Sequence, residues 1–218
     1  MTLIIERHSG EIIDIDLVPV FRFLPEHLSF YKNVWQNVHQ PAWAQKHQKG
    51  RSERINEALK KRFFLVPKPS QLPSQWRLDF HDTEIEILKD FGCAKPVIKS
   101  LKLFRDCNPQ LKSIVSYWLK TIVMDMIRNY PEDDWLQGQE AEYFLKSLKH
   151  LLEKLKKKNI DYFFDNTSNM LANKVKPATV FDMAKYLEKV INNLEDTKNT
   201  PECKATWLKY FSLVKDCN

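Results

Sequence analysis

The pattern of apolar and polar residues changes its period near residue 75. Before that point the apolar residues come in short runs separated by Gly, Pro and polar clusters, which is typical of strands. After it they recur every three or four residues, which is typical of amphipathic helices. The sequence therefore predicts an α+β protein with two parts, residues 1–74 carrying the strands and residues 75–218 forming a mainly helical lobe.

The first part predicts a hairpin, further extended segments and one helix. The hairpin joins residues 2–7 to residues 11–18 at Ser9 and Gly10, because glycine supplies the positive φ that a tight turn needs. The remaining expected elements are an extended piece over 20–23, a polar basic loop over 40–52, a helix over 53–62 and a buried strand over 63–66. Pro67 should end that strand, because proline cannot donate to the ladder.

The second part predicts helices joined by short connectors. The expected helices are 75–92, 96–104, one long helix opened by Asn108 and Pro109 with an apolar band from Leu111 to Met126, 140–158, 177–194 and 201–214. The segments 165–176 and 195–200 read as connectors. The apolar band of the helix opened by Pro109 is too wide for a one-sided surface helix, which predicts the central spine of the lobe.

Two carboxylates stand in an apolar setting near the start of the chain. Asp14 and Asp16 are two residues apart in an expected strand, so both side chains should leave the same face. A buried carboxylate is costly unless it meets a cation or hydrogen-bond donors, and paired carboxylates suit a divalent metal. The alternative is an edge hairpin whose polar face is wet.

Charge and composition favour a phosphate-bearing partner without requiring one. The chain has 34 Lys and Arg against 28 Asp and Glu, a formal net charge of +6. The first part of the chain contains a group of basic residues: Lys46, Lys49, Arg51, Lys60, Lys61 and Arg62. They are interpreted either as a nucleic-acid-binding surface or as ordinary solvated surface. The four cysteines form no C-x-x-C pair and read as free thiols of a reducing compartment. No apolar run has the length of a membrane span or of a signal peptide, so a cytoplasmic protein is expected.

Three motifs together resemble one enzyme family. They are Ile15-Asp16-Leu17-Val18-Pro19; Phe64-Leu65-Val66-Pro67-Lys68 followed by Trp76-Arg77-Leu78-Asp79-Phe80 and Glu84; and Ser116-Tyr117-Trp118-Leu119-Lys120-Thr121 preceded by Leu101-Lys102-Leu103-Phe104-Arg105. As a set they resemble cyclic GMP-AMP synthase and the wider male-abnormal-twenty-one group of nucleotidyltransferases, over about residues 11–165.

The resemblance implies the remnant of a nucleotidyltransferase mixed sheet followed by a helical lobe, with ATP and GTP bound in a cleft. Asp16 would be the third metal-binding carboxylate and would hold Mg²⁺ or Mn²⁺. The implied nucleotide contacts are Arg77 and Arg105 on triphosphates, Tyr117 stacked on a base, Ser116 on phosphate or base, and Glu84 facing the nucleotide; Arg105 stands where vertebrate members carry Lys. Without the motifs, Arg77 and Glu84 read as solvated helix residues and Tyr117 as a core aromatic.

Two departures from the family pattern affect the expected activity. The family's Gly-Ser turn and Glu/Asp-x-Asp pair do not precede Asp16 in these 218 residues. We therefore expect an N-terminally incomplete sequence, a short isoform or a noncatalytic relative that binds nucleic acid or protein, and no synthase activity from this chain alone.

The second departure concerns zinc. Residues 91–95, Phe-Gly-Cys-Ala-Lys, pass straight on where vertebrate members insert a zinc site, so no zinc is expected. This resembles the invertebrate receptor-type members and favours double-stranded RNA as the ligand.

Overall fold

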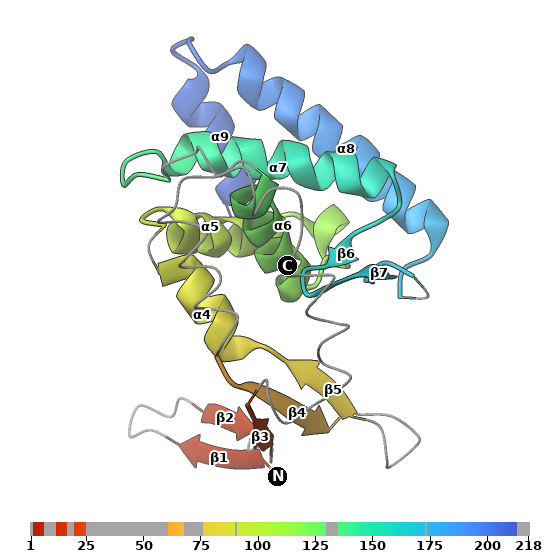
Figure 1. Ribbon diagram of the computed structural model, residues 1–218. Coiled ribbons are helices and arrows are strands. Elements are labelled where there is room, and N and C mark those ends of the chain that lie inside the picture. Colours follow the sequence, from red (N-terminus) through yellow and green to blue (C-terminus); the bar gives the residue numbers. More distant parts are fainter. Residues whose placement is uncertain are drawn as a thin grey trace. The chain divides into compact units, whose positions relative to one another are not determined.

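The computed structural model describes most of the chain as two compact units (Figure 1). The described residues are 2–6, 12–16, 20–24, 61–67, 76–89, 91–129, 135–172 and 174–212. The boundary between the units falls after Ile87, so the described residues up to Ile87 belong to the first unit and those from Leu88 onward to the second. The boundary expected between the strand-bearing part, residues 1–74, and the helical lobe, residues 75–218, stays a prediction.

The first unit begins with the predicted hairpin. Strands β1 (Thr2–Glu6) and β2 (Ile12–Asp16) pair antiparallel, with Thr2 opposite Asp16 and Glu6 opposite Ile12. The residues of the turn lie outside the described part of the chain. The pairing confirms the two predicted strands of the hairpin.

The first unit also contains a three-stranded sheet. It has the order β3 (Phe21–Phe23), β4 (Phe63–Pro67), β5 (Trp76–Asp79), with both pairs antiparallel. Phe63 is fully buried, with its ring 5.6 Å from Phe23 and 6.1 Å from Phe80. The extended segment at 20–23 and the buried strand at 63–66 are therefore confirmed. Most of the helix expected over 53–62 lies outside the described residues, although Lys61 and Arg62 are not helical.

The helix expected from residue 75 begins later than predicted. Trp76–Asp79 is strand β5 paired with β4, and helix α4 covers only His81–Lys89. The periodicity failed here because Trp76 and Leu78 also fit the period of two of a short strand. Asp79 marks the change, since its Oδ1 accepts a hydrogen bond from the His81 backbone N–H at 3.0 Å.

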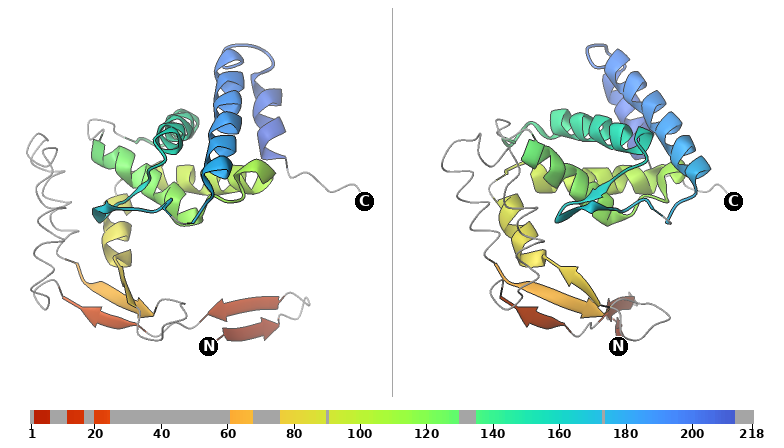
Figure 2. Two further views of the ribbon diagram at one scale, coloured as in Figure 1. Left: turned by 90° about the vertical axis from the view of Figure 1, so that its right-hand side faces the viewer. Right: turned by 45° about the vertical axis from the view of Figure 1, so that its right-hand side comes forward.

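The second unit is mainly helical. Its helices are α5 (Ala94–Cys107), the 3₁₀ turn η2 (Pro109–Leu111), α6 (Ser116–Asn129), α7 (Glu140–Lys156), α8 (Pro177–Asp196) and α9 (Cys203–Phe211). Helices α5, α6 and α7 pack on one another, while α8 lies beside α7 and α9 beside α5 and α8 (Figure 2). The last three predicted helices are confirmed to within a few residues.

The long helix expected from Pro109 is interrupted. Pro109 opens only the turn η2, and α6 begins at Ser116. The interruption has a local cause: the Ile114 carbonyl accepts a hydrogen bond from Arg105 Nη1 at 3.2 Å, and the Trp118 N–H bonds the Val115 carbonyl instead. The predicted spine is confirmed for α6, because buried residues occur all round this helix, among them Trp118, Ile122 and Met126.

The connector expected over 165–176 contains a strand. Strands β6 (Asp161–Tyr162) and β7 (Asp165–Asn169) form a small antiparallel hairpin after α7. Phe163 and Phe164 make the connection and are buried, and the Met170 N–H bonds the Ile160 carbonyl at 2.8 Å. The polar sequence of β7 concealed it, since β7 has none of the β-branched or aromatic alternation of a typical strand. The fold class is α+β, as predicted.

Candidate nucleotide-binding site

A hydrogen bond joins the end of α5 to the start of α6. Arg105 Nη1 donates to Ser116 Oγ at 2.8 Å as well as to the Ile114 carbonyl. The Arg105 side chain is only 16% exposed, which fixes the direction of its guanidinium. The structure thus brings together two residues that the sequence placed eleven positions apart.

The electrostatics at this point favour an anion. The cation of Arg105 meets the first turn of α6, where the helix dipole carries partial positive charge. Asp106 competes for the same guanidinium, with its Oδ1 at 2.8 Å from Nε and 2.7 Å from Nη2. The Asp106 side chain is 55% exposed, so this ion pair contributes little free energy and another anion can replace Asp106 at the guanidinium.

Tyr117 follows Ser116 and presents a half-buried ring. Its centroid lies 5.9 Å from that of Tyr162 in β6, with 35° between the ring planes. The hairpin β6–β7 therefore contacts the residue expected to stack on a base. Sequence reasoning missed Tyr162, whose only signal was the aromatic run Tyr162-Phe163-Phe164.

The other expected nucleotide residues lie in the first unit. Arg77 is in β5 opposite Val66, and Asp16 is in β2 opposite Thr2. Glu84 stands in the first turn of α4 and is 5% exposed. The side chains of Asp16 and Arg77 lie outside the described part of the structure, so their roles stay predictions.

Most of the predicted nucleic-acid residues also fall outside the described residues, namely Lys46, Lys49, Arg51 and Lys60. Lys61 is exposed. Arg62 Nε bonds Asp82 Oδ2 at 2.5 Å, with 48% of the Arg62 side chain exposed. Any phosphate contact by Arg62 would compete with this exposed ion pair.

The described side chains do not by themselves form a metal site. Over that part of the chain, no three His, Cys, Asp or Glu side chains converge as metal ligands. The expected ligand Asp16 belongs to a strand whose side chains are not described. The donor chemistry of Asp16 suits Mg²⁺ or Mn²⁺, which prefer carboxylate oxygen.

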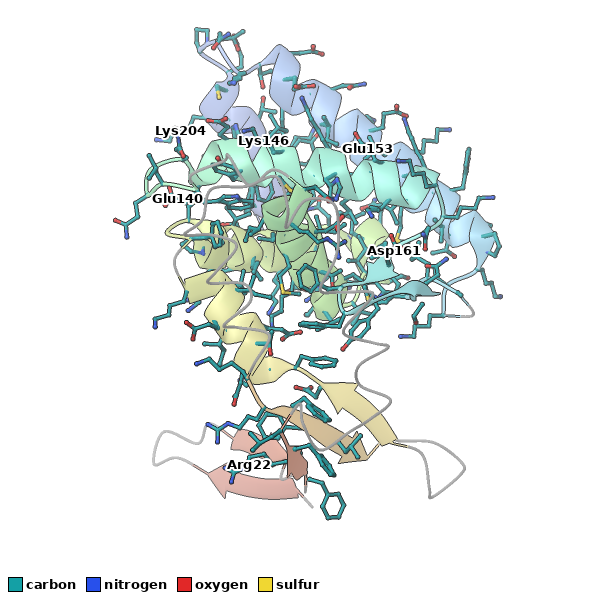
Figure 3. All side chains as sticks on the ribbon, in the orientation of Figure 1. Arg22, Glu140, Lys146, Glu153, Asp161 and Lys204 are labelled. Carbon is teal, nitrogen blue, oxygen red and sulfur yellow. The ribbon has the colours of Figure 1, made fainter. Side chains whose placement is uncertain are left out.

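A buried charge cluster lies deeper in the second unit. Asp125 of α6 is 4% exposed and accepts hydrogen bonds from Arg128 and, at 2.8 Å, from His150 Nε2. Lys154 Nζ lies 3.1 Å from Asp125 and 3.3 Å from Asp161, which Figure 3 labels on β6. Burial opposes ionisation of Asp125, but the His150 hydrogen bond and the charges of Arg128 and Lys154 outweigh it and hold the pKa of Asp125 well below its ordinary value.

The link between α4 and α5 is tightly packed. The Cys93 N–H bonds the Trp135 carbonyl at 3.0 Å, and a Cβ at Gly92 would lie 3.3 Å from Gln137 Cγ. Burial and the nearby charge of Glu140 raise the pKa of the Cys93 thiol to about 11. This thiol is therefore protonated at neutral pH and suits a packing role.

Comparison with known proteins shows which family the chain is similar to. Residues 93–189 match the family described as Mab-21 protein HhH/H2TH-like domain. A cyclic GMP-AMP synthase-like receptor of Aethina tumida is 30% identical over 211 residues, which are 95% of this chain and 48% of that protein. The chain is similar to this receptor along almost its whole length. A cyclic GMP-AMP synthase-like receptor of Ctenocephalides felis is 26% identical over 217 residues, which are 95% of this chain and 46% of that protein. One of Microplitis demolitor is 30% identical over 149 residues, which are 66% of this chain and 28% of that protein.

The chain thus spans about half the length of the family relatives that it matches over most of its own length. The relatives' names support membership of the nucleotidyltransferases. No helix among the described residues is both long and apolar enough to cross a bilayer.

Proposed function

We propose that the protein is a nucleotidyltransferase that joins ATP and GTP into a cyclic dinucleotide. Its similarity to the cyclic GMP-AMP synthase-like receptors supports this reaction class. The observation that carries the proposal is the contact of Arg105 with Ser116 beside Tyr117 at the start of α6. A cation, a hydroxyl and an aromatic ring at one helix N-terminus match the charge and the ring of a nucleoside triphosphate.

Each of the three residues has a distinct part in this proposal. Arg105 exchanges Asp106 for triphosphate oxygens and makes charge-assisted hydrogen bonds to them. Ser116 hydrogen-bonds phosphate, and Tyr117 stacks on the base with Tyr162 behind its ring. Holding the triphosphate and the base at once orients the reacting phosphorus for in-line attack.

We assign the remaining roles to the first unit. Asp16 holds the metal, Arg77 contacts phosphate and Glu84 faces the nucleotide. When bound, Mg²⁺ or Mn²⁺ neutralises charge on the phosphate oxygens and lowers the pKa of the attacking hydroxyl. The cytoplasm, where ATP and GTP are abundant, is the expected compartment.

The direct test of turnover uses the protein translated from its complete transcript. ATP, GTP and Mg²⁺ should yield a cyclic dinucleotide, and Asp16→Asn should abolish it while Asp182→Asn, which removes an exposed carboxylate of α8, should retain it. Equal rates in both variants would remove Asp16 from the site. The reading frame upstream of the Met1 codon gives an independent check, since an in-frame Gly-Ser followed by Glu-x-Asp supports the enzyme.

Double-stranded RNA is the proposed trigger, and RNA binding without catalysis is the second candidate function. The exposed Lys61 and half-exposed Arg62 favour a phosphate-binding face here. The test neutralises Lys46, Lys49, Arg51, Lys60, Lys61 and Arg62 together. RNA affinity should then fall and depend less steeply on salt. Unchanged affinity would show that this face is not the track, and RNA binding without product would favour the second function.

A further inference from the structure

A pocket of about 560 Å³ lies in the second unit. Its lining residues come from the hairpin β6–β7 and the start of α8, two elements that Figure 1 labels. Lys158 follows α7, Lys174 and Lys176 precede α8, and all three line the pocket. Leu171, Val175 and Val180 supply apolar wall. None of these residues belongs to the site at Arg105 and Tyr117.

The three lysines lack the ion pairs that neighbouring lysines make. Lys154 pairs with Asp125 and Asp161, and Lys156 Nζ pairs with Glu188 at 2.6 Å. Across the described residues, Lys158, Lys174 and Lys176 have no carboxylate partner, and no Asp or Glu lines the pocket. Three uncompensated ammonium groups around one concave surface produce a positive potential that favours an anion of more than one charge.

The wall that carries Lys158 is fixed by side-chain hydrogen bonds. Asn169 Oδ1 accepts the backbone N–H groups of Ile160 at 3.2 Å and Leu171 at 2.9 Å. Asn169 Nδ2 donates to the Lys158 carbonyl at 2.9 Å. Lys158 has φ of 51°, a conformation that usually selects Gly or Asn after a helix. A lysine therefore occupies a strained position at the pocket rim, held by the Asn169 bonds.

We propose that this pocket binds a small phosphate ester with at least two negative charges and an apolar or aromatic portion. The lysines bind the phosphate, while Leu171, Val175 and Val180 cover the apolar portion. The pocket volume lies within the usual range for small-molecule sites, about 300–1,000 Å³. A nucleic-acid duplex is too wide to enter such a cavity and would reach only its rim.

The test is a titration of the whole chain with phenyl phosphate and, separately, inorganic phosphate, followed by amide chemical shifts. Both should shift the amides of Lys158, Asn169 and Val175, and phenyl phosphate should bind several-fold more tightly because the apolar wall covers its ring. Lys174→Ala with Lys176→Ala should weaken phenyl phosphate roughly tenfold. The matched control removes the same charge at the exposed Lys198 and Lys204 and should change affinity less than about twofold.

The variants also separate this pocket from the proposed nucleotide site. Arg105→Ala should leave the shifts at Lys158 and Asn169 intact, so the proposal stands or falls independently of the proposed reaction. Unchanged phenyl phosphate affinity in the Lys174 and Lys176 variant, or an equal loss in the control, would overturn it. Loss of binding to a 20-base-pair RNA duplex without loss of phenyl phosphate binding would also overturn it and assign the lysines to a nucleic-acid face.

Discussion

The Arg105 guanidinium donates to Ser116 Oγ at 2.8 Å and so connects the last turn of α5 to the first residue of α6. The same guanidinium donates a hydrogen bond to the Ile114 carbonyl. One side chain thus sets where the central helix begins and places a positive charge beside its N-terminus. The proposed nucleotide site depends on this contact.

Replacing Arg105 should weaken nucleotide binding. Arg105→Ala removes charge-assisted hydrogen bonds worth about 1.5–3 kcal/mol each, so the affinity for ATP should fall roughly tenfold or more. Arg105→Lys keeps the charge but loses the fork of donors, so its ATP affinity should lie between those of the wild type and Arg105→Ala. Isothermal titration with ATP measures the effect. Since Arg105 also bonds Ile114 and Ser116 at the start of α6, each variant needs a thermal melt, and weakening that follows only loss of fold would contradict the phosphate role.

Removing the carboxylate of Asp106 should strengthen nucleotide binding. Asp106 shares the Arg105 guanidinium and adds negative charge near the incoming triphosphate. Asp106→Asn should therefore raise ATP affinity roughly two- to fivefold, as expected for an exposed ion pair. Asp182→Asn, an exposed carboxylate on α8, is the control of equal charge. Weaker binding in the Asp106 variant would show that Asp106 orients Arg105 rather than competing with phosphate.

Acid should destabilise the second unit through Asp125. The pKa of Asp125 is lowered in the folded protein, whereas an unfolded Asp titrates near about 3.9. Its contribution is therefore full above about pH 4 and is lost as the pH falls toward the folded pKa. Asp125→Asn should cost about 3–5 kcal/mol of unfolding free energy at pH 7, because it leaves Arg128 and Lys154 without their buried partner.

Urea unfolding at pH 7 and pH 3 measures this linkage. The difference between the wild type and Asp125→Asn should shrink at pH 3. Asp161→Asn is the control, because Asp161 is 25% exposed and has Lys154 at 3.3 Å as its cation and Asn159 Nδ2 at 2.6 Å as a neutral donor. An equal loss at both pH values would mean that the Asp125 side chain acts through shape and not through charge.

Periodicity predicted the parts of the fold that depend on broad apolar faces. Helices α7 and α8 and the spine character of α6 have wide buried stripes, which the spacing of Leu, Ile and Phe reports directly. Strand β5 and the start of α6 were misjudged because single side chains decide them. Asp79 ends the strand, and Arg105 takes the carbonyl that would have continued the helix.

The same reasoning explains which candidate site residues the sequence could predict. Arg105, Ser116 and Tyr117 stand in motifs, and the structure brings them together. Tyr162 and the pocket lysines stand in no motif. The hairpin β6–β7 brings Tyr162 to Tyr117, and the start of α8 brings Lys174 and Lys176 to the pocket that Lys158 also lines. Residues joined by tertiary contacts leave no fixed spacing in a sequence.

The most direct test of the nucleotide site is the effect of Tyr117 on base binding. ATP and GTP are titrated against the wild type, Tyr117→Phe and Tyr117→Leu, with inorganic tripolyphosphate as the ligand without a base. Base stacking is worth about 1–3 kcal/mol, so Tyr117→Leu should weaken ATP and GTP roughly five- to a hundredfold. Tyr117→Phe should bind like the wild type, and tripolyphosphate should bind all three proteins equally. ATP and GTP affinities unchanged by Tyr117→Leu, or no nucleotide binding by the wild type, would contradict the account.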